Sequence, residues 1–272
     1  MCGIIGLYHP TENVAGEIYD ALIQVQHRGQ DAAGIAAINK NKLSVHKDLG
    51  VVTEVFKTVE SLDLKGNVGI GHVRYPTAGC SDVSEAQPFH TINPVEICLA
   101  HNGTLTNSDE MREFLLNKKF CKFNTQSDSE VLLNLFAYEL SQTSFEVLES
   151  LHIFSALKEV YKRCEGGFAV AVLVEGVGLV GFRDSNGIRP LVLGKKDDGS
   201  FMVASESSAL SALGYIFESD VNPGEAIIIS EQGSIERKTC SENVSHTPCL
   251  FEFVYFSRPD SIIDSISVHK AR

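Results

Sequence analysis

The chain has 272 residues, of which 43% are hydrophobic and 21% are charged, a composition typical of a globular protein built as one large domain. Its formal net charge is −12 and no basic run offsets it, which argues against nucleic acid or an anionic membrane surface as a partner. No apolar run reaches transmembrane length and the start lacks a signal-peptide pattern, so we expect a cytoplasmic protein with no membrane span.

The first part of the chain alternates between strand-like and helical patterns. Continuous apolar runs predict buried strands at residues 2–8, 34–38, 67–75 and 96–100. Apolar residues at helical spacing predict helices at residues 17–26, 108–117 and 145–164, and another that begins at residue 127. The start of this last helix, Ser127-Asp128-Ser129-Glu130, matches a Ser-x-x-Glu capping box.

Short strands dominate the rest of the chain. Runs rich in Val, Ile and Phe predict strands at residues 168–174, 178–182, 191–193, 201–204, 226–230 and 251–256. The turns between them are too short for crossover helices, which favours antiparallel pairing, and the near-continuous apolar strands indicate sheets covered on both faces. The expected fold class is therefore α+β, a four-layer αββα sandwich with two mostly antiparallel sheets between helices.

One glycine pattern invites a different interpretation. Gly176-Val177-Gly178-Leu179-Val180-Gly181 matches the dinucleotide-binding fingerprint and follows a predicted strand. That fingerprint binds a pyrophosphate only where it opens a helix, and turn residues follow here instead. We therefore predict a hairpin at this position.

Cys2 is the first candidate for chemistry. Small second residues generally permit removal of the initiator methionine, after which Cys2 carries both a thiol and a free α-amino group. An α-amino group titrates near ~7.7–8.0, so it can serve as the base for the neighbouring thiol nucleophile. The Met-Cys pair alone equally fits a small apolar residue buried in a strand.

Three further positions carry groups that a thiol attacking an amide needs. His101-Asn102-Gly103 offers side-chain and backbone N–H donors for an oxyanion, although Asn-Gly is also a common turn. Arg74, at a strand end, fits a grip on a substrate carboxylate or a structural salt bridge. Asp128 fits capture of a substrate ammonium group or an acid favoured by the helix dipole. Together they describe a site for glutamine, provided that they converge.

The cysteines give no sign of a disulfide framework or a zinc site. The seven are odd in number and scattered, without a Cys-x-x-Cys pair: Cys2, Cys80, Cys98, Cys121, Cys164, Cys240 and Cys249. We expect no metal site in this chain.

Several motifs in one order carry a resemblance that runs from Cys2 to about residue 272. They are Met1-Cys2-Gly3-Ile4-Ile5-Gly6, Gln26-His27-Arg28-Gly29-Gln30-Asp31, His72-Val73-Arg74-Tyr75-Pro76-Thr77, His101-Asn102-Gly103, Ser127-Asp128-Ser129-Glu130, Arg183-Asp184, Asn186-Gly187-Ile188-Arg189-Pro190 and Tyr255-Phe256-Ser257-Arg258-Pro259-Asp260-Ser261. With these motifs the chain resembles the glutaminase domain of the amidophosphoribosyltransferase family, which are class II glutamine amidotransferases.

The resemblance implies an N-terminal-nucleophile hydrolase fold and a set of roles. Cys2 is implied to form a glutamyl thioester, and Asn102 and Gly103 to hold the oxyanion. The implied substrate-binding residues are Arg74, Asp128, Arg28, Gly29, Thr77 and His101. Residues 75–86 match a loop that closes over glutamine.

The resemblance also implies what lies outside this stretch. Family members pass ammonia to a phosphoribosyltransferase domain, a glycosyltransferase, which converts phosphoribosyl pyrophosphate to phosphoribosylamine in the first step of purine synthesis. We expect residues 2–250 to form the glutaminase domain and residues 251–272 to supply a last strand and the start of the connection to that second domain.

The cofactor and assembly expectations follow from the same likeness. The glutaminase step is expected to need no cofactor, and Mg is expected only in the second domain. An iron–sulfur cluster is possible in the full-length protein, with Cys249 near one ligand position, and a homo-oligomer is expected there. The alternatives are another class II amidotransferase, such as glucosamine-6-phosphate synthase, and a non-catalytic glutamine-binding module.

Overall fold

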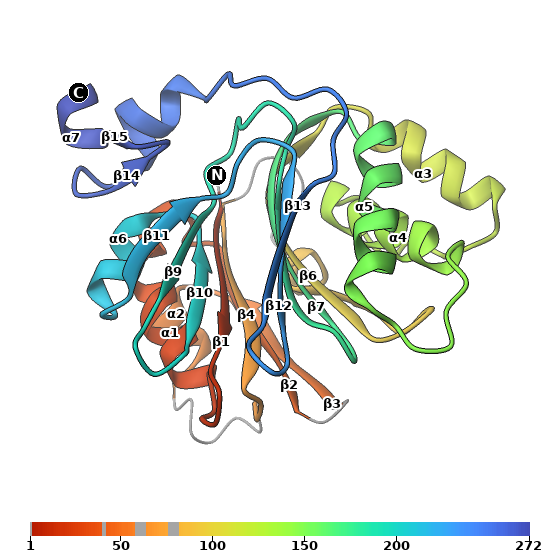
Figure 1. Cartoon of the computed structure of the whole chain (residues 1–272), viewed down its shortest axis with the longest axis horizontal. Coiled ribbons are helices and arrows are strands. Elements are labelled where there is room, and N and C mark those ends of the chain that lie inside the picture. Colours follow the sequence, from red (N-terminus) through yellow and green to blue (C-terminus); the bar gives the residue numbers. More distant parts are fainter. Residues whose placement is uncertain (1, 40–41, 58–63, 76–81) are drawn as a thin grey trace.

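The computed structural model describes residues 2–39, 42–57, 64–75 and 82–272. Two antiparallel sheets face each other, and each is covered on its outer face by helices (Figure 1). The predicted αββα sandwich of the α+β class is therefore confirmed.

The first sheet has its strands in the order β11-β9-β10-β1-β4-β2-β3. Their bounds are β1 (Gly3–Tyr8), β2 (Ala32–Asn39), β3 (Lys42–Leu49), β4 (Val68–Arg74), β9 (Val192–Lys195), β10 (Phe201–Ala204) and β11 (Ile216–Asp220). The second sheet has the order β13-β12-β8-β7-β6-β5. Its strands are β5 (Phe89–Thr91), β6 (Ile97–Leu105), β7 (Gly166–Val174), β8 (Gly178–Arg183), β12 (Glu225–Ser230) and β13 (Ile235–Thr239).

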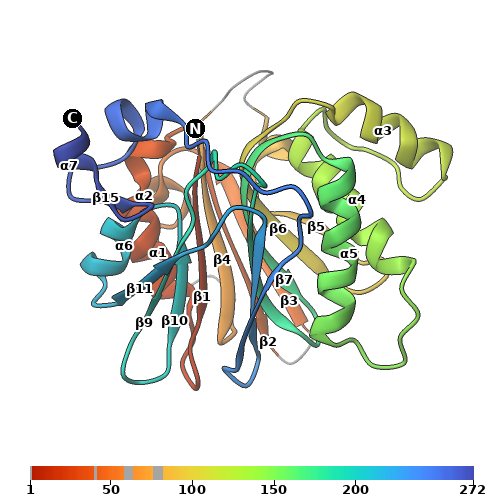
Figure 2. The ribbon, with the colours of Figure 1, turned by 45° about the horizontal axis from the view of Figure 1, so that its top comes forward.

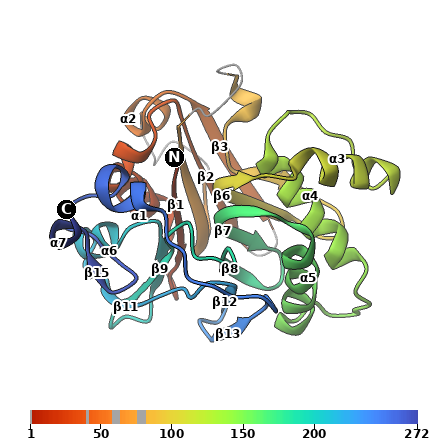
Figure 3. The same ribbon diagram turned by 90° about the horizontal axis from the view of Figure 1, so that it is seen from above.

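The helices fall into two outer layers, which are separated most clearly when the molecule is seen from above (Figure 3). The first sheet is covered by α1 (Ala15–Gln24), α2 (Val52–Val55) and α6 (Ser207–Ala212). The second is covered by α4 (Asp128–Ser141) and α5 (Ser150–Arg163), and α3 (Ser108–Asn117) packs against α4. Near α6 lies the C-terminal segment, with β14 (Ile262–Ile263), β15 (Ile266–Ser267) and α7 (Val268–Ala271). Within the described residues, no helix is both long and apolar enough to cross a bilayer.

Strand alternation builds the core on both faces of each sheet. In β7, Phe168, Val170 and Val172 pack toward the α4–α5 layer, whereas Ala169 and Ala171 belong to the core between the sheets. The small alanines on the inner face leave little side-chain bulk between the sheets, which suits close packing of one sheet on the other. The apolar strands are buried on both sides for this reason, as their sequence predicted.

Two expectations about strand ends are corrected by the structure. Strand β6 continues through Asn102 and Gly103 to Leu105, so His101-Asn102-Gly103 is extended backbone and not a turn. The predicted strand at residues 251–256 is wrong, because residues Glu252–Phe256 form a π-helical turn in which the N–H of Ser257 donates to the carbonyl oxygen of Glu252. An apolar-rich run such as this one fits either structure by pattern alone.

The predicted hairpin at the glycine fingerprint is confirmed, because β7 and β8 pair directly across it. The capping box is only half present. The Ser127 hydroxyl accepts from the N–H of Ser129 at 3.2 Å, but the Glu130 carboxylate turns to Asn124 and Thr125 instead of the Ser127 backbone. It thereby fastens the loop before α4, which places Asp128 at the start of that helix.

Candidate active site

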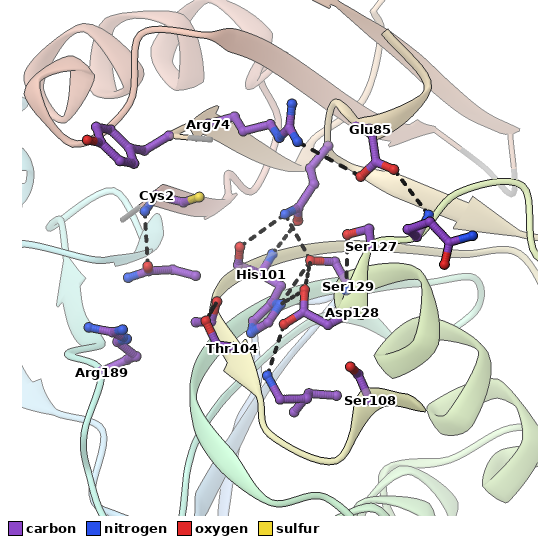
Figure 4. Close-up of a pocket in the computed structure, with 16 residues that line it drawn as sticks. Cys2, Arg74, Glu85, His101, Thr104, Ser108, Ser127, Asp128, Ser129 and Arg189 are labelled. Carbon is purple, nitrogen blue, oxygen red and sulfur yellow. Dashed lines mark hydrogen bonds and ion pairs between the residues drawn. The ribbon is translucent and has the colours of Figure 1, made fainter. Parts of the chain in front are cut away.

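A cavity of about 300 Å³ is lined by Cys2, the residue before β1. The start of β1 lies at one rim of the sandwich (Figure 2). Its lining residues, drawn in Figure 4, are Cys2, Arg74, Tyr75, Glu85, Gln87, His101, Asn102, Gly103, Thr104, Leu105, Ser108, Gln126, Ser127, Asp128, Ser129 and Arg189. Cys2, Arg74, His101, Asn102, Gly103 and Asp128 were all predicted from the sequence, and they meet here. Thr77 lies outside the described residues.

Cys2 enters the cavity from the start of the central strand β1. Its backbone nitrogen donates to Oδ1 of Asn102 at 3.1 Å, and its carbonyl oxygen accepts from Nε of Arg28 at 3.0 Å. Burial raises the pKa of the Cys2 thiol, while a backbone hydrogen bond with Tyr75 and the charges of Arg74 and Arg28 oppose that rise. The thiol is therefore held neutral near pH 7 and needs a base beside it to react.

The contact with Cys2 fixes the orientation of the Asn102 amide. Because Oδ1 accepts from Cys2, Nδ2 points the other way, and among the described residues it has no hydrogen-bond partner although it is buried. A buried donor without a partner is costly, so its persistence beside a nucleophile marks a place for an acceptor.

A second donor comes from the free edge of β6. Strand β5 pairs with β6 only as far as Leu99, so later N–H groups on that edge find side-chain acceptors. The N–H of His101 donates to Oε1 of Gln87 at 2.7 Å, and that of Leu105 donates to Oδ2 of Asp128 at 2.9 Å. Strand alternation puts the N–H of Gly103 on the same edge between them, where Gly103 lines the cavity.

Glycine is required at position 103 by close approach. A Cβ there would lie 2.2 Å from the carbonyl oxygen of Gly167 and 2.7 Å from Nε2 of His101. The His101 ring thus occupies the space that a side chain at position 103 would take. Its Nδ1 lies 2.9 Å from the Ser129 hydroxyl, and burial lowers the pKa of His101, which keeps the ring neutral.

Both charged candidates for substrate recognition line the cavity, and both also have structural partners. Nη1 of Arg74 lies 3.1 Å from Asp31, and Nη2 lies 3.9 Å from Glu85. Asp128 accepts from Leu105 through one oxygen, and its side chain is 24% exposed, so the carboxylate remains reachable from the cavity.

Arg28 and Gly29 lie behind the cavity and do not line it. The Arg28 side chain is fully buried, with Nη1 at 2.7 Å from Glu206 and Nη2 at 2.8 Å from Glu252. A Cβ on Gly29 would come within 2.5 Å of the Arg74 backbone. The geometry therefore suits these two residues to positioning Cys2 and Arg74, whereas the sequence placed them among substrate-binding residues.

Ten lining residues were not predicted as site residues, among them Glu85, Gln87, Ser129 and Arg189. Gln87 links two elements of the site, because its Nε2 donates to the carbonyl oxygen of His101 at 3.2 Å and to Ser129 at 3.0 Å. It therefore holds the free edge of β6 at the level of the donor pair. Nothing in the sequence around Gln87 indicated a site residue, whereas Ser129 and Arg189 belong to motifs that the sequence analysis had already identified.

The described part of the chain gathers no three His, Cys, Asp or Glu side chains that could hold a metal ion. Cys249 is a free, partly exposed thiol, and its N–H donates to the carbonyl oxygen of Ile188 at 3.4 Å. As a single ligand it does not make a cluster site among these residues.

The buried carboxylate of Glu206 is expected to stabilise the folded protein in a pH-dependent way. Burial disfavours its charged form, but the hydrogen bond from His27 and the charge of Arg28 outweigh burial and lower the pKa of Glu206 to about 2. The stabilisation is present above the unfolded pKa of ~4.3 and is lost as the pH falls toward 2. We expect Glu206→Gln to cost about 3 kcal/mol at pH 7 and to flatten the pH dependence of unfolding in that window.

Urea unfolding at pH 7, 4 and 2.5 checks this expectation. Glu242→Gln is a suitable control, since Glu242 is exposed. An unchanged pH dependence in the Glu206 variant would contradict the assignment.

The fold and the cavity define a class of protein: a sandwich of the N-terminal-nucleophile type with a thiol in the lining of its cavity. A family model described as "Glutamine amidotransferase domain" matches residues 72–212. Since this is more than half of the chain, the chain belongs to the glutamine amidotransferase domain family.

Over its whole length, the chain is similar in sequence to amidophosphoribosyltransferases. That of Escherichia coli (strain K12) is 51% identical over 277 residues, which cover 100% of this chain and 55% of the relative. That of Saccharomyces cerevisiae is 44% identical over 282 residues, with the same shares. The chain thus spans about half the length of the relatives it matches, and the resemblance drawn from its motifs is confirmed.

Solved structures agree. The glutamine phosphoribosylpyrophosphate amidotransferase from B. subtilis, complexed with ADP and GMP, matches with a TM-score of 0.85 at 34% identity. The match covers 98% of this chain and 55% of that one. A glutamine aminotransferase class-II domain protein from Silicibacter pomeroyi matches with a TM-score of 0.53 at 14% identity, a likeness in fold alone.

Proposed function

We propose that this chain is a glutaminase domain that hydrolyses glutamine to glutamate and ammonia through a Cys2 thioester. One observation carries the proposal: the nitrogen of Cys2 is held 3.1 Å from Oδ1 of Asn102, while Nδ2 of the same amide is buried without a partner. Cys2 is thus held beside a hydrogen-bond donor, Nδ2 of Asn102, that could bind the oxyanion of the substrate. The N–H of Gly103 at the edge of β6 supplies a second donor.

The reaction begins after removal of Met1, when the nitrogen of Cys2 becomes an α-amino group. This amine takes the thiol proton, and the thiolate adds to the side-chain amide carbon of glutamine. The oxyanion accepts hydrogen bonds from Asn102 and Gly103. The carbon–nitrogen bond then breaks, the leaving nitrogen takes the proton from the α-ammonium group, and ammonia departs from the thioester.

Hydrolysis repeats these roles with water. The free α-amino group accepts a proton as water adds to the thioester carbon, and the same two donors stabilise the second oxyanion. Breakage of the carbon–sulfur bond releases glutamate, and the proton returns to the thiolate. His101 remains neutral and supports the strand that carries the donors.

Arg74 and Asp128 orient the amino acid. The Arg74 guanidinium binds the α-carboxylate of glutamine, and the partly exposed Asp128 carboxylate binds its α-ammonium group. These charges lie in the same cavity as Cys2, which favours a zwitterionic substrate over a neutral amide.

Arg74→Lys gives a direct test of that orientation. Lysine keeps the charge but loses the planar fork, so we expect KM for glutamine to rise about tenfold, equal to about 1.4 kcal/mol, with kcat nearly unchanged. Steady-state glutamate release measures both constants. Lys65→Arg serves as a control outside the cavity lining. An unchanged KM in Arg74→Lys would remove Arg74 from the substrate site.

The remainder of the proposal concerns the whole protein. Ammonia would convert phosphoribosyl pyrophosphate to phosphoribosylamine, the first step of purine synthesis, in a second domain that uses Mg. Residues 2–250 would form the glutaminase domain and residues 251–272 the connection. Any iron–sulfur cluster near Cys249, and a homo-oligomer, would be properties of that full-length protein. Six free thiols among the described residues support a reducing compartment, and hence the cytoplasm.

Glutamate release measured together with the intact mass tests the function. We expect release from protein whose mass lacks Met1. Glutamine binding without release would support a non-catalytic glutamine-binding module, and full activity with Met1 retained would overturn the proposed base.

A further inference from the structure

Behind the cavity, three buried charged side chains, Glu252, Arg28 and Glu206, form a network of ion pairs. The network continues to Arg189 in the cavity lining, whose side chain is 16% exposed. Glu252 lies 2.8 Å from Nη2 of Arg28 and 3.5 Å from Nη1 of Arg189, and Glu206 lies 2.7 Å from Nη1 of Arg28. Two positive and two negative charges balance, as burial requires. Glu252 is the member that touches both arginines.

At one end of this ion-pair network, Arg28 contacts Cys2. Nε of Arg28 donates to the carbonyl oxygen of Cys2, while both oxygens of Glu252 accept from Nη2 at 3.0 and 2.8 Å. Because a guanidinium is planar, the carboxylates on its Nη atoms set the direction of Nε. By orienting Arg28, Glu252 therefore helps to fix the position of the Cys2 backbone.

At the other end of the ion-pair network, Arg189 reaches the lining of the cavity. Arg189 lines the cavity on the side where Cys2 lies (Figure 4). Its Nε and Nη1 are buried and have no hydrogen-bond partner among the described residues. Its backbone is held by the Asp184 carboxylate, which accepts from the N–H of Arg189 at 3.1 Å. The guanidinium pairs with the Glu252 carboxylate.

We propose that Glu252 is a positioning residue for Cys2 that acts through Arg28, a role that rests on the function proposed above. The same carboxylate also pairs with Arg189 in the cavity lining. It couples the nucleophile to the C-terminal segment, because the turn that carries Glu252 belongs to that segment. Glu206 secures the same segment by accepting from the N–H of Arg258 at 2.9 Å and from Ser261 at 2.8 Å.

Glu252→Gln tests this role in the full chain with Met1 removed. Gln keeps the shape but not the charge, so Arg28 loses a partner on one side of its fork. We expect kcat for glutamate release to fall about tenfold with KM within about twofold, because only the placement of the nucleophile changes. Glu252→Asp keeps the charge on a shorter side chain, and we expect an intermediate loss of kcat of about threefold.

Alkylation of Cys2 by iodoacetamide gives a readout that needs no glutamine. The mass of the N-terminal peptide reports its extent. With Glu252 neutral, the Arg28 charge is less compensated and favours the Cys2 thiolate, so we expect about threefold faster alkylation at pH 7 in Glu252→Gln. Cys2→Ser supplies the background.

Asp260→Asn is the matched control, since Asp260 lies on the same segment in an exposed pair with Arg258. A lower melting temperature with wild-type kcat and alkylation in Glu252→Gln would overturn the proposal. If that variant does not fold, wild-type kcat and alkylation in Glu252→Asp would overturn it equally. Absence of glutamate release from the parent chain would instead overturn the proposed function, and alkylation would still decide the role of Glu252.

Discussion

Cys2→Ala should abolish glutamate release from glutamine while leaving the fold intact. The variant keeps a small second residue, so removal of Met1 is unaffected, and the α-amino group still reaches Oδ1 of Asn102. It loses the sulfur atom that attacks the amide. Removal of the nucleophile in other hydrolases costs on the order of 10⁶-fold in kcat, and we expect activity to fall to background here.

The fold should tolerate this change because the Cys2 side chain faces the cavity and leaves no void in the packed core. Cys121→Ala is the matched control, since Cys121 is also a partly buried free thiol and lies outside the cavity lining. Glutamate release, intact mass and thermal unfolding should be measured on both. Turnover above background in Cys2→Ala would remove the thioester from the mechanism.

Much of the fold could be predicted because local pattern and tertiary structure agree. The helix predicted at residues 108–117 has the bounds of α3, and the strand at residues 201–204 those of β10. Both combine a clear period with good boundary residues. Strand β3 was missed because its sequence, Lys42–Leu49, is largely polar, as befits an edge strand with little burial.

The convergence of the site could not be read from the sequence itself. Cys2 and Asn102 are 100 residues apart, and they meet because β1 and β6 face each other across two sheets. Neither residue carries a signal of that contact. The candidates were chemically sensible one by one, but each also had a structural interpretation, and only the resemblance favoured one interpretation over the other.

Residues behind the cavity were harder still. The sequence grouped Arg28 with the substrate-binding residues because of its motif, whereas the fold surrounds it with Glu206 and Glu252 from distant segments. A buried ion pair of this kind depends on which carboxylates the topology delivers, and no local pattern encodes that. The π-helical turn that carries Glu252 was predicted as a strand for another reason, because its apolar-rich run fits either structure by pattern alone.

Asn102→Asp should reduce kcat by about 10²–10³-fold with little change in KM for glutamine. The substitution keeps an oxygen atom to accept from the nitrogen of Cys2 and replaces the unpartnered Nδ2 donor by a second oxygen. The thiol would therefore remain in place, but a negatively charged oxygen would face the developing oxyanion. Steady-state glutamate release gives both constants.

Alkylation by iodoacetamide separates the two contacts that Asn102 makes, because displacement of iodide from a methylene carbon forms no oxyanion. If Nδ2 stabilises the oxyanion, Asn102→Asp should lose far more amide turnover than Cys2 alkylation, which the added negative charge slows only by lowering the thiolate fraction. A parallel loss of both would mean that Asn102 serves only to hold Cys2. Asn243→Asp controls for the added charge, since Asn243 is exposed and lies away from the cavity lining. Because an oxyanion donor contributes only where an amide carbonyl is attacked, this difference between the two reactions would connect the vacant Nδ2 to the chemistry itself.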